Sequence, residues 1–94
     1  MEPTVTDNRS RSRYELLIDG QIAGVADYVD DGHCVVLPHT LVEHEQRGKG
    51  LAAVVVRHAL DDLRARGRAV VPSCWYVQRF IDEHPEYADL VTGP

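Results

Sequence analysis

An apolar, β-branched stretch leads into a glycine-bearing turn and then into a long helical pattern, and this order most constrains the fold. The stretch covers residues 34–37 and 41–42, the turn covers residues 47–52, and the helical pattern continues to residue 66. Glycine lets the backbone turn tightly and approach a ligand closely, because it has no Cβ. The sequence therefore predicts a strand that passes directly into a helix.

The predicted turn has the physical features of a phosphate-binding site. The N–H groups of a first helical turn point outward, and the helix dipole adds about half a positive charge there. Arg47 and Lys49 contribute two further charges. The glycine spacings of the P-loop and of the dinucleotide fingerprint are both absent. An ordinary strand-to-helix turn with solvated cations is the alternative at this point.

The helix after the turn is the clearest element that the sequence predicts. Its apolar residues recur at the spacing of one helix face, and they are Ala52, Val56, Ala59, Leu60 and Leu63. Two pairs of opposite charges lie four residues apart and are expected on the exposed side, Arg57 with Asp61 and Asp62 with Arg66. The pattern predicts an amphipathic helix that covers one face of a sheet.

The segments on either side of this helix predict a mixed sheet. Strands are predicted over residues 13–18, 21–28, 33–37, 40–42 and 68–71, with a hairpin turn at Asp19-Gly20 and a bulge or strand join at Pro38. A second helix is predicted over residues 74–83, followed by one last turn. The order is β-β-β-β-α-β-α. A strand–helix–strand unit requires a parallel fourth and fifth strand, so the expected class is α/β with a mixed sheet.

Length and charge limit what the chain can be. Its 94 residues predict one domain, with a flexible N-terminal tail over residues 1–12, a folded domain over 13–90 and a short tail over 91–94. The net charge of −5 argues against general binding of nucleic acid or of anionic membranes. Two cysteines are too few for a disulfide scaffold, which favours a reducing cytoplasmic location. The His and Cys spacings predict no metal site.

Four short motifs occur in order along the chain: His39-Thr40, Arg47-Gly48-Lys49-Gly50-Leu51-Ala52, Val70-Val71-Pro72-Ser73-Cys74 and His84-Pro85-Glu86-Tyr87. Together they resemble the GCN5-related N-acetyltransferase family, and within it the very small single-domain members. The second motif resembles the coenzyme A signature of that family, Q/R-x-x-G-x-G/A. The resemblance extends from about Tyr14 to Tyr87.

The resemblance implies a fold and a cofactor. The fold is an acyl-CoA N-acyltransferase-like core in which the parallel fourth and fifth strands splay apart. The cofactor is acetyl-CoA or another acyl-CoA, with its pantetheine arm between those strands and its diphosphate on the amides of the turn. The cofactor-binding residues implied are Leu41, Val42, Arg47, Gly48, Lys49, Gly50, Leu51 and Ala52. The reaction implied is transfer of an acetyl group to an amine, for which a protein or peptide amine is one candidate.

The usual catalytic groups of the family cannot be carried over to this chain. Its tyrosine acid would fall within residues 77–81, which contain no tyrosine, and its strand carboxylate is missing from the apolar residues 35–37. Cys74 is expected near the thioester, as a nucleophile, as a proton donor or as a packed thiol. His39 is the candidate base, because imidazole titrates near neutral pH, and a structural histidine at the bulge is its alternative.

Three functions therefore stay open at this stage. The first is a small acetyl-CoA-dependent N-acetyltransferase. The second is a coenzyme A-binding module with little or no catalysis, regulatory or partner-binding, for which the missing acid and base are the motive. The third is an interaction domain without a cofactor. Trp75 and Tyr76 would line an acceptor cleft in the first case, and core packing is their alternative.

Overall fold

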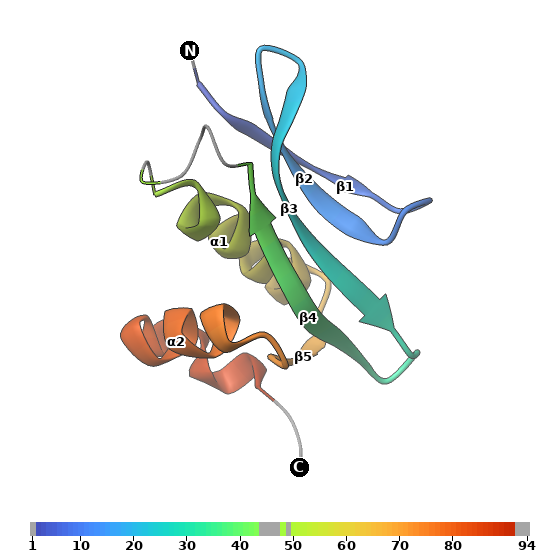
Figure 1. Cartoon of the computed structure of the whole chain (residues 1–94). Coiled ribbons are helices and arrows are strands. Elements are labelled where there is room, and N and C mark those ends of the chain that lie inside the picture. Colours follow the sequence, from blue (N-terminus) through green and yellow to red (C-terminus); the bar gives the residue numbers. More distant parts are fainter. Residues whose placement is uncertain (1, 44–47, 49, 92–94) are drawn as a thin grey trace.

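The computed structural model describes residues 2–43, 48 and 50–91, and they form a five-stranded sheet with helices packed against it (Figure 1). The elements in chain order are β1 (Thr4–Asn8), β2 (Arg13–Ile18), β3 (Gln21–Asp30), β4 (Cys34–Val42), α1 (Leu51–Ala65), β5 (Ala69–Val71), α2 (Trp75–Glu83) and the 3-10 helix η2 (Pro85–Leu90). The strands lie in the order β1-β2-β3-β4-β5. The first four are antiparallel and β4 is parallel to β5, which confirms the predicted mixed sheet.

The N-terminal segment corrects the predicted flexible tail over residues 1–12. Residues Thr4–Asn8 form the edge strand β1, which pairs with β2 from Thr4 opposite Leu17 to Asn8 opposite Arg13. The segment carries too few apolar residues to show a strand period. Its β-branched residues nevertheless favour an extended backbone, and Val5 packs against the core. An edge strand of this kind is held largely by backbone pairing, which periodicity does not report.

Strand β4 also corrects the prediction, because it is one strand and not two. Asp27 lies opposite His39, whereas Val29 lies opposite Val36, so one extra residue sits in β4 near Pro38. This offset is a β-bulge, where a residue without an N–H group is tolerated. The sheet thus has four strands before α1, as predicted, but β1 supplies the fourth.

The core lies between α1 and one face of the sheet. The buried residues of α1 are Leu51, Val55, Val56, Ala59, Leu60 and Leu63, so the predicted apolar face is confirmed apart from the partly exposed Ala52. Helix α2 extends the core with Val77, Phe80 and Ile81. In the described part of the chain, no helix combines the length and the apolar character needed to cross a bilayer.

One of the two predicted ion pairs on α1 is confirmed. Arg66 lies 3.1 Å from Asp62. Arg57 and Asp61 instead meet at the hydroxyl of Tyr87, which accepts from Arg57 at 3.1 Å and donates to Asp61 at 2.6 Å. The His84-Pro85-Glu86-Tyr87 motif therefore fastens η2 to α1, because η2 carries that hydroxyl between the two side chains.

Candidate functional site

Strands β4 and β5 pair over a short distance, after which β5 ends and β4 continues. Their parallel pairing joins Cys34, Val35 and Val36 to Ala69, Val70 and Val71. Beyond this pairing, the backbone N–H of Cys74 donates to the carbonyl oxygen of Leu37 at 2.9 Å. The rest of β4, residues 39–42, extends past the end of β5. We call the β5-facing edge of residues 39–42 the splay, and the parallel pairing before it confirms the predicted parallel fourth and fifth strands.

The bulge in β4 decides which backbone groups face the splay. The N–H group of Glu43 donates to β3 at 2.8 Å. In an antiparallel pair alternate residues point the same way, so His39 and Leu41 also direct their backbone groups to β3. The backbone groups of Thr40 and Val42 point toward the splay. Of the two β4 residues expected to contact the cofactor, Val42 faces the splay and Leu41 faces β3.

Cys74 lies at the near end of the splay. It is the N-cap residue of α2, only 9% of it is exposed, and its Sγ lies 3.8 Å from Oγ1 of Thr40. Thr40 pairs with the buried Ala26, so its side chain is on the face of the sheet that α1 covers. The structure therefore joins a thiol and a hydroxyl beside the backbone that the cofactor is expected to contact.

The second cysteine belongs to a different environment. Cys34 lies at the opposite end of β4, where its Sγ is 3.7 Å from Oδ2 of Asp31. Desolvation and the neighbouring Asp31 carboxylate raise the pKa of the Cys34 thiol. Cys34 is also partly exposed and is not among the buried core residues of the described structure.

His39 and Cys74 lie on different faces of the sheet. His39 pairs with Asp27, and its Nδ1 lies 3.2 Å from Oδ2 of that carboxylate. Its side chain is 57% exposed. Because neighbouring residues of a strand point to opposite faces, His39 projects away from the face on which Thr40 meets Cys74. The two predicted catalytic residues thus approach the splay from opposite sides.

The turn before α1 has the predicted glycine geometry. Gly48 and Gly50 both have positive φ, 83° and 73°, a conformation that favours glycine. Gly50 is the N-cap of α1, no side chain of the described residues caps it, and no carboxylate stands in the first helical turn. Leu51 is buried beneath this turn. The predicted contacts Arg47 and Lys49 lie outside the described residues.

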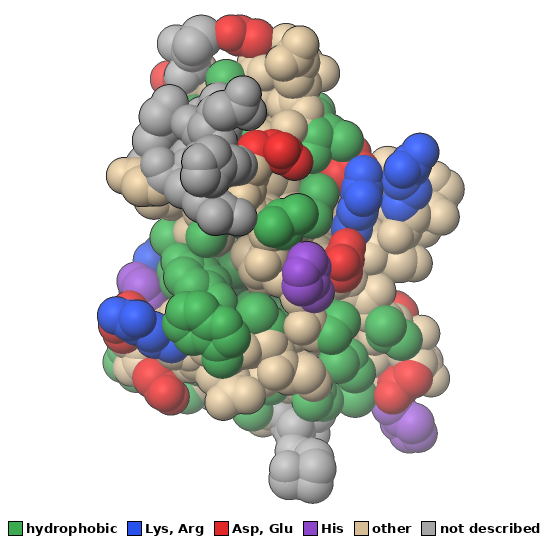
Figure 2. Space-filling model, viewed as in Figure 1, with side chains coloured by type: hydrophobic (Ala, Val, Ile, Leu, Met, Phe, Trp, Pro, Cys, Tyr) green, Lys and Arg blue, Asp and Glu red, His purple; other side chains and the backbone are tan. Residues whose placement is uncertain are grey.

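The aromatic pair at the start of α2 divides between surface and core. Trp75 is 69% exposed, whereas Tyr76 is half-buried and packs against the core, with the two rings 5.9 Å apart. Burial raises the pKa of Tyr76. Figure 2 shows hydrophobic side chains gathered over α2 next to β4, with histidine and acidic side chains over the neighbouring strands. Of the two alternatives, core packing fits Tyr76 and not Trp75.

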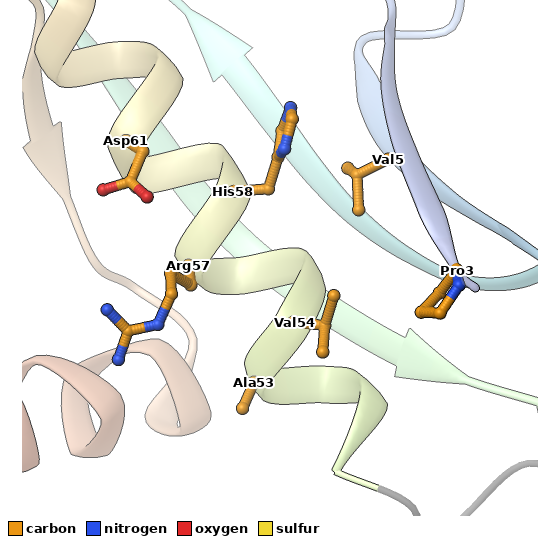
Figure 3. Close-up of a pocket in the computed structure, with 7 residues that line it drawn as sticks. All are labelled: Pro3, Val5, Ala53, Val54, Arg57, His58 and Asp61. Carbon is orange, nitrogen blue, oxygen red and sulfur yellow. The ribbon is translucent and has the colours of Figure 1, made fainter.

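A groove of about 350 Å³ runs between β1 and the exposed side of α1 (Figure 3). Its lining residues are Pro3, Val5, Ala53, Val54, Arg57, His58 and Asp61. Figure 3 shows that the side chains of Arg57 and Asp61 point to the other side of the helix, where both bond to Tyr87. The groove is therefore mainly apolar and lies apart from Cys74.

Sequence reasoning assigned no role to Thr40 or Asp27. Thr40 contacts the candidate thiol, and Asp27 contacts the candidate base. Asp27 lies in a predicted strand two segments earlier, so only the β3–β4 register reveals its position beside His39. That register depends on the bulge, whose exact position the sequence did not fix.

Comparison with known families and proteins adds independent evidence. A family model described as GCN5-related N-acetyl-transferase matches residues 13–90. The protein NATD1 of Bos taurus is 33% identical over 89 residues, which cover 86% of this chain and 74% of that protein. NATD1 of Homo sapiens is 29% identical over 84 residues, which cover 86% of this chain and 74% of that protein.

Two solved structures share the fold. The ribosomal-protein-S18-alanine N-acetyltransferase from Escherichia coli aligns with a TM-score of 0.63 at 21% identity, over 77% of this chain and 50% of that chain. The present chain thus spans half the length of that enzyme. A GCN5-like putative N-acetyltransferase from Staphylococcus aureus aligns with a TM-score of 0.56 at 18% identity, over 97% and 89% of the two chains.

Proposed function

The chain belongs to the GCN5-related N-acetyltransferase family, and from this premise we propose that it binds acetyl-CoA and transfers the acetyl group to an amine. The observation that carries the proposal is the splay of β4 and β5 next to the N-terminus of α1. Acetyl-CoA needs such an arrangement, because its amide-containing arm can pair with a strand edge and its diphosphate can bind at a helix end.

The diphosphate is assigned to the turn before α1. The helix geometry leaves the amides of Leu51, Ala52 and Ala53 without intrahelical acceptors, and no carboxylate in the first turn neutralises the helix dipole. Gly48 and Gly50 allow the backbone to approach an anion closely. Arg47 and Lys49, which the sequence places in the same turn, add positive charge.

The pantetheine arm is assigned to the splay. Its amide groups would pair with the backbone of β4 at Thr40, which points in that direction. The thioester would then lie close to Cys74, at the end of the splay where the Cys74 N–H bonds to Leu37. In this placement the ligand lies beyond the end of β5, beside the part of β4 that a longer β5 would cover.

Cys74 is assigned as the proton donor to the departing thiolate. The attacking amine forms a bond to the acetyl carbon, and the carbon–sulfur bond breaks, so that the coenzyme leaves as a thiolate. The Cys74 thiol carries a proton, and a side chain positioned beside the leaving group can transfer its proton to that group in the transition state. Thr40, 3.8 Å from Sγ, orients the Cys74 side chain toward the splay.

Calorimetric titration with acetyl-CoA tests the cofactor assignment. We expect a saturable heat and a raised melting temperature, because a ligand that binds only the folded chain stabilises it. A chain that shows neither effect at millimolar acetyl-CoA does not have the proposed function.

Substitution of Cys74 tests the chemical role. Cys74→Ala should slow acetyl transfer about a hundredfold and leave the Kd for acetyl-CoA unchanged, whereas Cys34→Ala should alter neither. Intact-mass measurement after incubation with acetyl-CoA should show unmodified protein. A gain of one acetyl group on Cys74 would instead make the thiol a nucleophile that forms an acyl-enzyme.

A coenzyme A-binding module without catalysis is the second candidate function. The observation that favours it is Phe80, which stands in the segment where the family places its tyrosine acid and is 3% exposed. Phe80 stacks on His84 with the ring centroids 4.1 Å apart, so the segment has a packing role. Slow release of coenzyme A from a panel of amines, unchanged in Cys74→Ala, would support this candidate.

A further inference from the structure

The stretch of β4 beside the splay presents two chemically different faces. Thr40 points to the helix-covered face together with the buried Ala26. His39 and Asp27 form the adjacent cross-strand pair, and their side chains are 57% and 41% exposed on the opposite face. Figure 1 views the sheet from that opposite face, where β4 lies in front and α1 behind. An acyl group in the splay can therefore be reached from a side that α1 does not cover.

The His39–Asp27 contact is held by the sheet itself. The two residues are directly paired across β3 and β4, so backbone hydrogen bonds fix both side-chain origins. Nδ1 of His39 lies 3.2 Å from Oδ2 of Asp27. When Nδ1 donates its hydrogen to the carboxylate, Nε2 carries the lone pair and is the proton acceptor. The pair thus selects the tautomer that a base needs.

The next charge in the same row does not compete for this carboxylate. Arg13 on β2 pairs across the sheet with Asp27, but its guanidinium Nε bonds to Glu15 at 2.8 Å. Glu15 also accepts from Asn8 at 3.1 Å. The Asp27 carboxylate is therefore left to His39 among the groups that face it from β2, β3 and β4 in the described structure.

We propose that the acceptor amine enters from the open face of the sheet, and that Asp27 is a positioning residue that holds His39 to take its proton. The inference rests on the proposed acetyl transfer. The amine nitrogen bonds to the acetyl carbon, its proton passes to Nε2 of His39, and the carbon–sulfur bond breaks. The coenzyme thiolate takes the Cys74 proton, and both side chains return to their starting states by proton exchange with water.

The same face indicates the class of acceptor. Leu41 lies two residues beyond His39 on the same face and is 42% exposed, so an apolar contact stands beside the base. No helix encloses this face in the described structure, which leaves room for an extended chain. A net charge of −5 favours a cationic partner. The acceptor that fits is an amine on an exposed peptide segment, with an apolar neighbour.

Acetylation kinetics test the proposal with two probe peptides. One peptide has a single free α-amine and the other a single lysine ε-amine, all other amines being blocked, and coenzyme A release from acetyl-CoA is followed. We expect His39→Gln to lower kcat about a hundredfold and Asp27→Asn about tenfold, with the Kd for acetyl-CoA unchanged. Asp27→Glu should restore part of the loss. Asp19→Asn makes the same charge change at the exposed β2–β3 hairpin and should leave kcat unchanged.

Nitrogen-15 NMR of the His39 ring tests the role of Asp27 without measuring turnover. The wild-type ring should be protonated at Nδ1 when neutral, and Asp27→Asn should redistribute the tautomers. A bare Nδ1 in the wild type, or equal kcat losses in Asp27→Asn and Asp19→Asn, overturns the inference. Failure of acetyl-CoA to bind would overturn the proposed function instead, and the tautomer would still report on the pair.

Discussion

The two ends of α1 are built on opposite principles. At its C-terminal half, Asp62 accepts from the buried hydroxyl of Tyr14 at 2.7 Å, and Arg66 bonds to both Asp62 and Asp7. At its N-terminus, Gly50 provides no side-chain cap and the first turn contains no carboxylate. A helix that followed stability alone would place acidic groups there. The C-terminal half of α1 thus fastens the fold, and its N-terminus has no acidic group that would oppose the proposed diphosphate.

The two ends of α1 also differ in their contacts. The C-terminal half, which we call the fastened end, is held by side-chain hydrogen bonds to β1, β2 and η2. The N-terminal end has no carboxylate in its first turn, and two glycines of positive φ precede it. If the division is real, substitutions at one end should change stability without changing cofactor affinity, and substitutions at the other end should do the reverse.

The largest effect is expected from Asp62→Ala, which removes the partner of a buried hydroxyl. Tyr14 is 1% exposed, so its hydroxyl cannot turn to water, and the loss should be about 2 kcal/mol in the free energy of unfolding. The Kd for acetyl-CoA should not change. Urea denaturation and calorimetric titration measure the two quantities on the same preparation.

Asp62→Asn is the matched control, because an amide oxygen still accepts from Tyr14. It should retain most of the stability that Asp62→Ala loses. Equal losses in the two variants would mean that the charge of Asp62, through its 3.1 Å contact with Arg66, matters more than the buried hydrogen bond.

Gly50→Val should give the complementary result. A β-branched side chain at φ of 73° strains the backbone, and the turn must shift away from the geometry that presents its amides. We expect acetyl-CoA affinity to fall about tenfold, with a stability loss of about 1 kcal/mol.

Gly67→Val tests whether strain alone explains that result. Gly67 has φ of 68° just after the other end of α1, and at either glycine a Cβ would meet no atom of the described residues within 4 Å. The stability loss should match that of Gly50→Val, but the affinity should not change. A similar loss of affinity in both variants would place the diphosphate elsewhere.

The sequence was informative where a single segment determined the structure. The apolar face of α1 and the Asp19-Gly20 hairpin are confirmed, with φ of 52° and 79° at the two turn residues. Each depends on local spacing or on the conformational freedom of one or two residues. The positive φ of Gly48 and Gly50 before α1 belongs to this class, whereas the assignment of that turn to the cofactor stays a prediction, and Arg47 and Lys49 lie outside the described residues.

The sequence was least informative where two distant segments had to be placed together. Strand β1 is visible only through its pairing with β2, and Asp27 reaches His39 only because of the bulge near Pro38. Arg57 and Asp61 have the spacing of an ion pair, yet both form hydrogen bonds with the Tyr87 hydroxyl. Register and tertiary hydrogen bonds decide these contacts, and neither leaves a periodic signal.

The smallest effect is expected in the outer part of the fastened end, where the Asp7 carboxylate accepts hydrogen bonds from both Arg66 and Tyr28. The Tyr28 hydroxyl donates to Asp7 at 2.6 Å, and burial together with this carboxylate raises the pKa of Tyr28 to about 12 from 10.0. The folded chain therefore keeps this proton to a higher pH than the unfolded chain. The stabilising contribution is complete below pH 10 and is lost as the pH rises through about 12.

Tyr28→Phe should remove this contribution. At neutral pH the variant should be about 1 kcal/mol less stable than the wild type, because one hydrogen bond is lost. The difference should shrink between pH 10 and 12, since only the wild type carries the raised Tyr28 pKa. Urea denaturation of both proteins at several pH values measures it, and acetyl-CoA affinity at neutral pH should be the same for both. A stability difference that stays constant up to pH 12 would show that Tyr28 and Asp7 are not coupled, and that the fastened end stops at Arg66.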